Sequence, residues 1–168
     1  MGMKQYSLKR WWRHLNMTRR QLRHAFPEAT LSAIADCVRD SEQQHGGEIR
    51  VAIEAELSLR ALLTGQTPRE RAVEVFASLG VADTQAGNGV LIYLCLADRD
   101  VEIVADHGLN THVSDAEWAG VCTQLERDCA AGHYGSGMCT AVRAVGGLIG
   151  RHFPAADRNE QVDRPTLL

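Results

Sequence analysis

Apolar residues along this chain recur with two spacings, and the spacing separates predicted strands from predicted helices. Ile49, Val51 and Ile53 alternate with less apolar neighbours, which predicts a strand over residues 48–55. Residues 90–96 and 101–105 are two further apolar runs, joined by a short acidic turn at residues 98–100. The run over 90–96 is apolar on both faces, as expected for a central strand covered on both sides. These two runs are predicted to form a hairpin.

Apolar residues three and four positions apart, together with capping signals, predict helices. Thr18 followed by Gln21, and Ser114 followed by Glu117, have the spacing of capping boxes. Pro68 suits the first position of another helix. The predicted helices cover residues 4–15, a short segment from Thr18, 27–44, 58–64, 68–79, 115–131 and 136–152.

The order of these elements predicts the fold. A helix crosses over between the first and second strands, so these two strands are predicted to be parallel. The short turn between the second and third strands makes that pair antiparallel. We therefore predict an α/β fold, a three-layer α/β/α sandwich with a small mixed β-sheet.

This topology brings polar residues to one end of the sheet. The end of the third strand, at Asp106 and His107, should lie beside Asn88, the loop that holds Asp83, and the turn over residues 45–48. Oxygen ligands from Asp83, Asn88 and Asp106 would suit Ca²⁺ or Mg²⁺ better than zinc. The same residues also suit plain turn chemistry, because Asn88 precedes a glycine and Asp106 can end a strand.

A second acidic end competes for the role of site. Glu54, Glu56, Asp98 and Asp100 gather at the opposite end of the predicted sheet. Ligands of open α/β sheets bind at the carboxyl ends of parallel strands, which favours this end. The loops, glycines and histidines favour the Asp106 end, because loops on a rigid scaffold more often carry function. His14, His24 and His152 are expected at the surface or at helix ends.

Charge is unevenly distributed along the 168 residues. Residues 1–27 hold seven bases and no acid, whereas the remainder holds eleven bases and 21 acids. We expect three regions: a basic amphipathic helical segment over 1–26, the α/β/α domain over 27–153, and a polar, loosely ordered tail over 154–168. The acidic body argues against nucleic acid as a partner. Residues 4–24 could contact an anionic membrane surface or an unknown protein partner, and Trp11 and Trp12 could form a membrane wedge or pack on the body.

Cysteine usage and hydropathy bear on the compartment. Four of the five cysteines, Cys37, Cys95, Cys122 and Cys129, fall on apolar stripes and are interpreted as reduced core residues. No apolar run approaches the roughly 20 residues of a membrane span, and the N-terminus lacks a signal-peptide pattern. The expectation is a soluble cytoplasmic protein, with peripheral membrane association through the basic segment.

Several motifs together resemble the TPM domain family. They begin with Gly47-Glu-Ile-Arg-Val51 and continue with Ala72-Val-Glu-Val-Phe76, Asn88-Gly-Val-Leu-Ile92, Asp98-Arg-Asp-Val-Glu-Ile103 and Gly132-His-Tyr-Gly-Ser-Gly137. The resemblance covers roughly residues 28–152 and implies a compact α/β/α domain in a soluble bacterial subgroup. Members are described as acid phosphatases, as calcium binders, or as accessory proteins of membrane complexes. Where many members have glycine after the third strand, this chain has Asp106 and His107.

Two functions remain in competition. The first is an accessory or interaction protein that acts at a membrane surface through the basic segment. The second, carried by the resemblance alone, is a divalent-cation-dependent phosphomonoesterase. In that hypothesis Asp83, Asn88 and Asp106 hold Ca²⁺ or Mg²⁺, the ion neutralises phosphate charge, and His107 acts as general acid. The sequence contains no dedicated nucleophile motif, which favours the first function.

Overall fold

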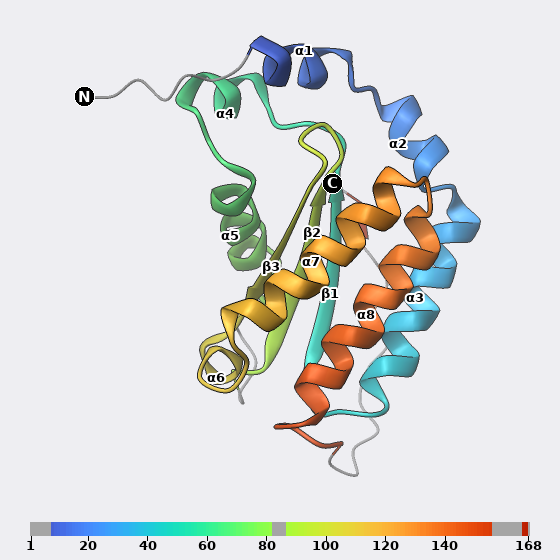
Figure 1. Ribbon diagram of the computed structural model, residues 1–168, viewed down its shortest axis with the longest axis vertical. Helices are drawn as coiled ribbons and strands as arrows, with labels where there is room; N and C mark the ends of the chain where they lie inside the picture. Colours follow the sequence, from blue (N-terminus) through green and yellow to red (C-terminus); the bar gives the residue numbers. More distant parts are fainter. Residues whose placement is uncertain (1–7, 82–86, 156–165, 168) are drawn as a thin grey trace.

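The sheet of the computed structural model is mixed and lies between two layers of helices (Figure 1). The structure describes residues 8–81, 87–155 and 166–167. The elements follow in the order α1 (Leu8–Asn16), α2 (Arg19–Ala25), α3 (Glu28–Glu42), β1 (Glu48–Glu54), α4 (Leu59–Thr64), α5 (Pro68–Ser78), β2 (Gly89–Cys95), β3 (Asp100–Ala105), α6 (His107–Asn110), α7 (Asp115–Ala130), α8 (Tyr134–Gly150) and β4 (Thr166–Leu167). The predicted three-layer α/β/α sandwich is confirmed.

The sheet has the order β3-β2-β1-β4. β1 and β2 pair in parallel, from Glu48 opposite Gly89 to Glu54 opposite Cys95. β2 and β3 are antiparallel, with Val90 opposite Ala105. Every residue of β2 is buried, as expected for a central strand. The tail was predicted to lack regular structure, but Thr166–Leu167 adds a short parallel strand to β1, because the edge of β1 offers unpaired backbone groups.

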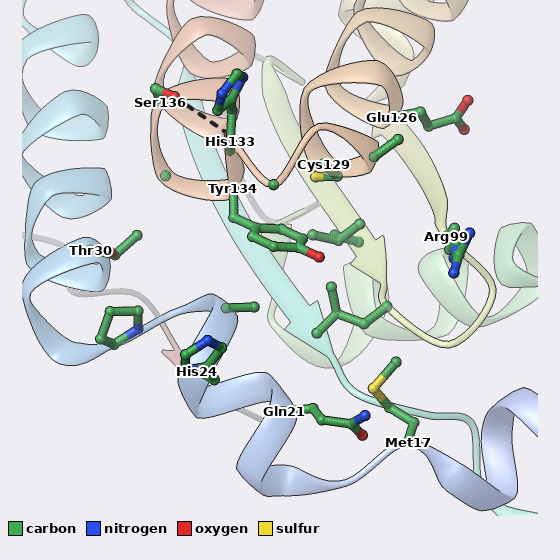
Figure 2. Close-up of a pocket in the computed structure, with 17 residues that line it drawn as sticks. Met17, Gln21, His24, Thr30, Arg99, Glu126, Cys129, His133, Tyr134 and Ser136 are labelled. Carbon is green, nitrogen blue, oxygen red and sulfur yellow. Dashed lines mark hydrogen bonds between the residues drawn. The ribbon is translucent and has the colours of Figure 1, made fainter.

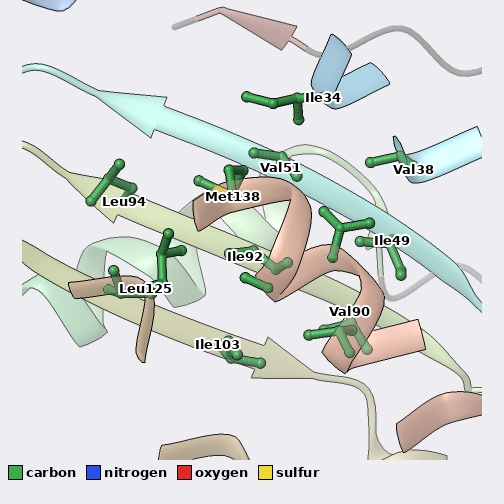
Figure 3. Packing of buried hydrophobic residues seen from close by; sticks show 14 of the residues in the cluster. Ile34, Val38, Ile49, Val51, Val90, Ile92, Leu94, Ile103, Leu125 and Met138 are labelled. Atoms are coloured by element: carbon green, nitrogen blue, oxygen red, sulfur yellow. The ribbon is translucent and has the colours of Figure 1, made fainter. Parts of the chain in front are cut away.

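The alternation of side chains along the strands creates two apolar clusters, one on each face of the sheet. Helices α3, α7 and α8 cover one face, where Ile49, Ile92 and Met138 pack together (Figure 3). Helices α4 and α5 cover the other face, over Leu91 and Tyr93. A strand buried on both faces must be apolar throughout, which is why β2 has no polar alternation.

Helix boundaries follow the predicted capping signals closely. Thr18, Thr67 and Ser114 each accept a backbone N–H from the residue three positions on, and all three capping boxes are complete. The last helix begins at Tyr134 rather than at residue 136, so Ser136 lies within its first turn.

Cys37 departs from the reduced state predicted for it. Cys37 on α3 and Cys139 on α8 form a disulfide. The two residues are 102 positions apart, and only the packing of α3 on α8 brings them together. Cys95, Cys122 and Cys129 are free thiols, as predicted. Burial raises the pKa of Cys95 to about 12 and those of Cys122 and Cys129 to about 11.

Candidate functional site

Asp106 follows β3 and forms the N-cap of the short helix α6. Its backbone N–H donates to Gly89 O at 2.9 Å, which places it next to the start of β2. The Asp106 Oδ1 atom accepts the backbone N–H of His107 at 2.6 Å and lies 2.8 Å from His107 Nδ1. The other oxygen, Oδ2, is buried, and no hydrogen-bond partner for it exists within the described residues. A buried carboxylate oxygen without a partner costs about 1–3 kcal/mol, so this atom would gain from a positive ligand.

His107 has the opposite exposure. Its side chain is 89% exposed, whereas that of Asp106 is 9% exposed. Because Oδ1 is an acceptor, the contact with Asp106 places the imidazole proton on Nδ1 and leaves Nε2 open. The ring lies over Gly87, where an added Cβ would come within 2.7 Å of the ring carbon Cε1. A glycine at this position therefore makes room for the ring.

Asn88 joins Asp106 at the same end of the sheet, as predicted. Its side chain is buried, and Nδ2 donates to Gly46 O at 2.6 Å. This bond ties the start of β2 to the turn that precedes β1. The third predicted ligand, Asp83, lies outside the described residues. The structure therefore brings together two of the three predicted ligands, with His107 beside them.

His45 lies in the neighbouring turn but serves the fold. Its Nδ1 accepts the Gly47 N–H at 3.2 Å, and its Nε2 lies 3.1 Å from Ser41 Oγ. Because Nδ1 is an acceptor, the neutral ring carries its proton on Nε2 and donates it to Ser41. Burial lowers the pKa of His45, which favours this neutral form. The pair therefore holds the turn and leaves no base to activate the serine.

At the opposite end of the sheet, Asp98 is surrounded by bases from α1. Arg10 donates to both carboxylate oxygens, at 2.9 and 2.8 Å, and also to Gln66 O. His14 Nε2 lies 3.1 Å from Asp98 Oδ1, close enough for an ion pair but outside hydrogen-bond geometry. Burial favours the neutral acid, yet the contacts with His14 and Arg10 outweigh it and hold the pKa of Asp98 well below its usual range. His14 was predicted at the surface but is 3% exposed, because it lies between α1 and this carboxylate.

His14, Cys95 and Asp98 have potential ligand atoms within 4.8 Å of one another. Their hydrogen bonds argue against a metal. His14 Nδ1 accepts the Leu57 N–H at 3.1 Å, so Nε2 carries the proton and offers no lone pair. Arg10 occupies the Asp98 oxygens, and burial keeps Cys95 a thiol. This cluster attaches α1 to the β2–β3 turn.

Glu54, the other acid predicted at this end, is also paired. Arg71 donates to both of its oxygens at 3.0 Å, and the Tyr93 hydroxyl donates to Oε2 at 2.6 Å. Asp100 is different, because burial and the nearby carboxylates of Glu102 and Glu126 raise its pKa to about 6. Asp100 Oδ1 is buried and, like Asp106 Oδ2, has no hydrogen-bond partner among the described residues, but the raised pKa leaves this carboxyl largely neutral below about pH 6.

The contacts between α1 and Asp98 decide which face of this helix is exposed to solvent. Trp11 is partly buried and packs against the cluster beneath α4 and α5. Leu8, Trp12 and Leu15 are 87%, 70% and 67% exposed. Trp11 therefore packs on the body, which is one of the two roles predicted, whereas Trp12 is exposed. The part of the chain that the structure describes contains no helix long and apolar enough to cross a membrane.

Comparison with known proteins identifies relatives of known structure. The model of the TPM domain family matches residues 21–148. The solution structure of the BA42 protein from the psychrophilic bacterium Bizionia argentinensis matches with 28% identity and a TM-score of 0.71, over 83% of this chain and 92% of that one. No curated protein matches the chain.

Two further solution structures share the fold at lower identity. The N-terminal domain of a protein from P. gingivalis matches with 19% identity and a TM-score of 0.58, over 89% of this chain and 94% of that one. The N-terminal domain of the cg2496 protein from Corynebacterium glutamicum matches with 13% identity and a TM-score of 0.54, over 80% and 79%. Helix α1 lies before the range that the family model matches.

Proposed function

Because the chain belongs to the TPM domain family, we propose that it is an accessory protein that acts at an anionic membrane surface, with α1 as the contacting element. The observation that carries this proposal is the exposed apolar face of α1. Leu8, Trp12 and Leu15 are spaced four and three residues apart, so they share one face of the helix. All three are more than 60% exposed.

The opposite face of α1 supports the same function. Arg10 and His14 point to Asp98 and attach the helix to the body, so the apolar face is held outward. Interfacial helices combine such a face with surrounding basic residues. Arg19, Arg20 and Arg23 on α2 are exposed, and no acid occurs between residues 8 and 27. Each base near an anionic surface contributes about 1 kcal/mol of binding. This charge favours an anionic membrane over a neutral protein groove.

Co-sedimentation with vesicles tests this function. Wild-type protein should bind vesicles that contain phosphatidylserine and release them as salt rises, and it should bind neutral phosphatidylcholine vesicles weakly. The double substitution Leu8→Gln and Leu15→Gln should remove most binding. Val73→Gln is the matched control, because Val73 is an exposed apolar residue on α5, outside the proposed contact. Equal binding to neutral and anionic vesicles, or equal binding of the double variant, would reject the proposal.

A second candidate function is cation-dependent phosphate-ester hydrolysis at the Asp106 end. Two features favour it. Asp106 Oδ2 is buried without a hydrogen-bond partner among the described residues, and the exposed ring of His107 contacts Asp106 Oδ1. Asp106 and Asn88, with Asp83, would hold Ca²⁺ or Mg²⁺, and the ion would neutralise phosphate charge. In this hypothesis His107, whose exposed ring contacts the same carboxylate, would serve as general acid for the leaving group.

Hydrolysis of p-nitrophenyl phosphate with each cation tests the second function. His107→Gln should abolish metal-stimulated hydrolysis, whereas His112→Gln should preserve it, because His112 is an exposed histidine whose ring stacks on His152. Metal-stimulated hydrolysis that survives His107→Gln would show that His107 is not the general acid.

A further inference from the structure

A cavity of about 930 Å³ lies between α2, the carboxyl end of β2 and the first turn of α8 (Figure 2). It is at the end of the sheet opposite Asp106, and it includes none of the exposed residues of α1. The carboxyl ends of parallel strands are where open α/β sheets bind ligands. Its volume lies within the range of small-molecule sites, about 300–1,000 Å³.

The cavity has an apolar side and a polar side. The apolar lining includes Met17, Ala25, Leu94, Leu96 and Cys129, which come from four separate segments. Arg99, Tyr134 and His24 provide polar groups around it, and in Figure 2 the Tyr134 hydroxyl points into the space that Met17 and Arg99 border. A pocket with an apolar wall and a few convergent polar groups suits an amphiphilic small molecule.

Arg99 is the cation available to such a ligand. It is exposed, and its backbone φ of +56° lies in the left-handed region that favours glycine or asparagine. Within the described residues, its guanidinium makes no hydrogen bond or ion pair, although Glu126 lines the same cavity. The Glu126 carboxylate instead accepts the Val101 N–H at 3.3 Å. That negative charge disfavours a second anionic group, so we expect a ligand with a single anionic head.

Tyr134 is fixed in place by close packing around the start of α8. Its ring lies 5.5 Å from that of Phe26, measured between centroids. A Cβ at Gly135 would lie 2.7 Å from Thr30, and one at Gly137 would lie 2.6 Å from Asp128, so glycine permits this close approach. The Tyr134 hydroxyl has no hydrogen-bond partner among the residues that the structure describes, and the α8 N-cap makes no side-chain bond. The hydroxyl and the first-turn N–H groups can therefore donate to an anion.

We propose that this cavity binds a small amphiphile with one anionic head, a phosphate or a carboxylate, and a short apolar tail. The head contacts Arg99 and the Tyr134 hydroxyl. The tail packs on Leu94, Leu96 and Met17. The site is independent of the proposed membrane contact, because the exposed face of α1 is not part of its lining.

Titration calorimetry with octyl phosphate, below its micelle-forming concentration, tests the proposal. Wild-type protein should bind octyl phosphate at least tenfold more tightly than inorganic phosphate or 1-octanol. Arg99→Asn should weaken binding at least tenfold, and Tyr134→Phe severalfold. Arg127→Asn should bind normally, because Arg127 is an exposed arginine of α7 outside the lining.

The melting temperature separates binding from stability. Asparagine tolerates the left-handed backbone better than arginine, so Arg99→Asn should melt at the same temperature as wild type or higher. The Leu8→Gln and Leu15→Gln variant should bind octyl phosphate normally, whatever its affinity for vesicles. Three results would each overturn the site. They are no binding of octyl phosphate by wild type, unchanged binding by Arg99→Asn, or binding of inorganic phosphate or 1-octanol as tight as that of octyl phosphate.

Discussion

Asp98 and Asp106 stand at opposite ends of the same β-hairpin, and the chain treats their buried carboxylates differently. Both Asp98 oxygens bind Arg10, and His14 lies 3.1 Å from Oδ1. Asp106 Oδ1 contacts the His107 ring, and Oδ2 is buried without a hydrogen-bond partner among the described residues. A buried carboxylate is stable only when it is paired and hydrogen-bonded. Asp98, whose oxygens are both bonded, therefore attaches α1 to the body. Asp106, with one oxygen left without a partner, is a candidate ligand site.

The attachment at Asp98 also gives the N-terminal segment its role. An isolated helix of nine residues, the length of α1, is marginal in water. The contacts with Asp98 fix one face of α1, and the exposed face then presents Leu8, Trp12 and Leu15 to solvent. The same contacts direct Arg10 and His14 inward, so the membrane proposal depends on the other bases of this region.

The largest effect should come from breaking the attachment. Asp98→Ala should lower the free energy of unfolding by about 3 kcal/mol, because it leaves the partly buried Arg10 guanidinium without its counter-charge. Urea denaturation at neutral pH measures the change. Asp36→Ala is the matched control, because Asp36 forms only an exposed pair with Arg39, worth about 0–1 kcal/mol. A change at Asp98 no larger than that of the control would mean that the attachment is not stabilising.

The next effect concerns the open end. A divalent cation held by Asp106 should stabilise the folded state by about 2.7 kcal/mol at a hundredfold excess over its dissociation constant. Asp106→Asn should remove most of the rise in melting temperature with Ca²⁺ or Mg²⁺. It should leave the metal-free protein at least as stable, because the buried carboxylate oxygen without a partner is replaced by an uncharged amide. If wild type shows no shift with either cation, or Asp106→Asn keeps it, Asp106 is not a ligand.

The smallest effect concerns Asp100, which shares the Asp98 end but has no cation of its own. Burial and neighbouring acids raise its pKa from 3.8 to about 6. The folded state therefore binds this proton more tightly than the unfolded state, and wild-type stability should fall as pH rises from about 4 to 6. Asp100→Asn should remove this contribution and stabilise the protein at pH 7 by about 1 kcal/mol, a value reduced for solvent screening. An unchanged pH dependence in the variant would contradict the assignment.

The sequence predicted the features that depend on local pattern. Periodicity and turn length were enough to place Asp106 beside Asn88, because strand direction follows from the connections between strands. Capping boxes marked the starts of α2 and α7, and Pro68 marked the start of α5.

Contacts between distant segments could not be read from those patterns. Arg10 and Asp98 are 88 residues apart, and Cys37 and Cys139 are 102 apart. The sequence left open whether Trp11 and Trp12 pack on the body. Adjacent helical residues point in directions about 100° apart, so only the docked position of α1 decides which is exposed. A histidine in a basic helix gives no signal that it faces a buried carboxylate.

Quenching of tryptophan fluorescence by brominated lipids tests the membrane role of α1 most directly. In anionic vesicles with brominated acyl chains, wild-type emission should be quenched, and the quenching should persist in Trp11→Phe but disappear in Trp12→Phe. Trp118 is buried within the body and serves as the internal unquenched reference. If Trp12→Phe is quenched as strongly as wild type, or if wild type is not quenched at all, the exposed face of α1 does not enter the membrane surface.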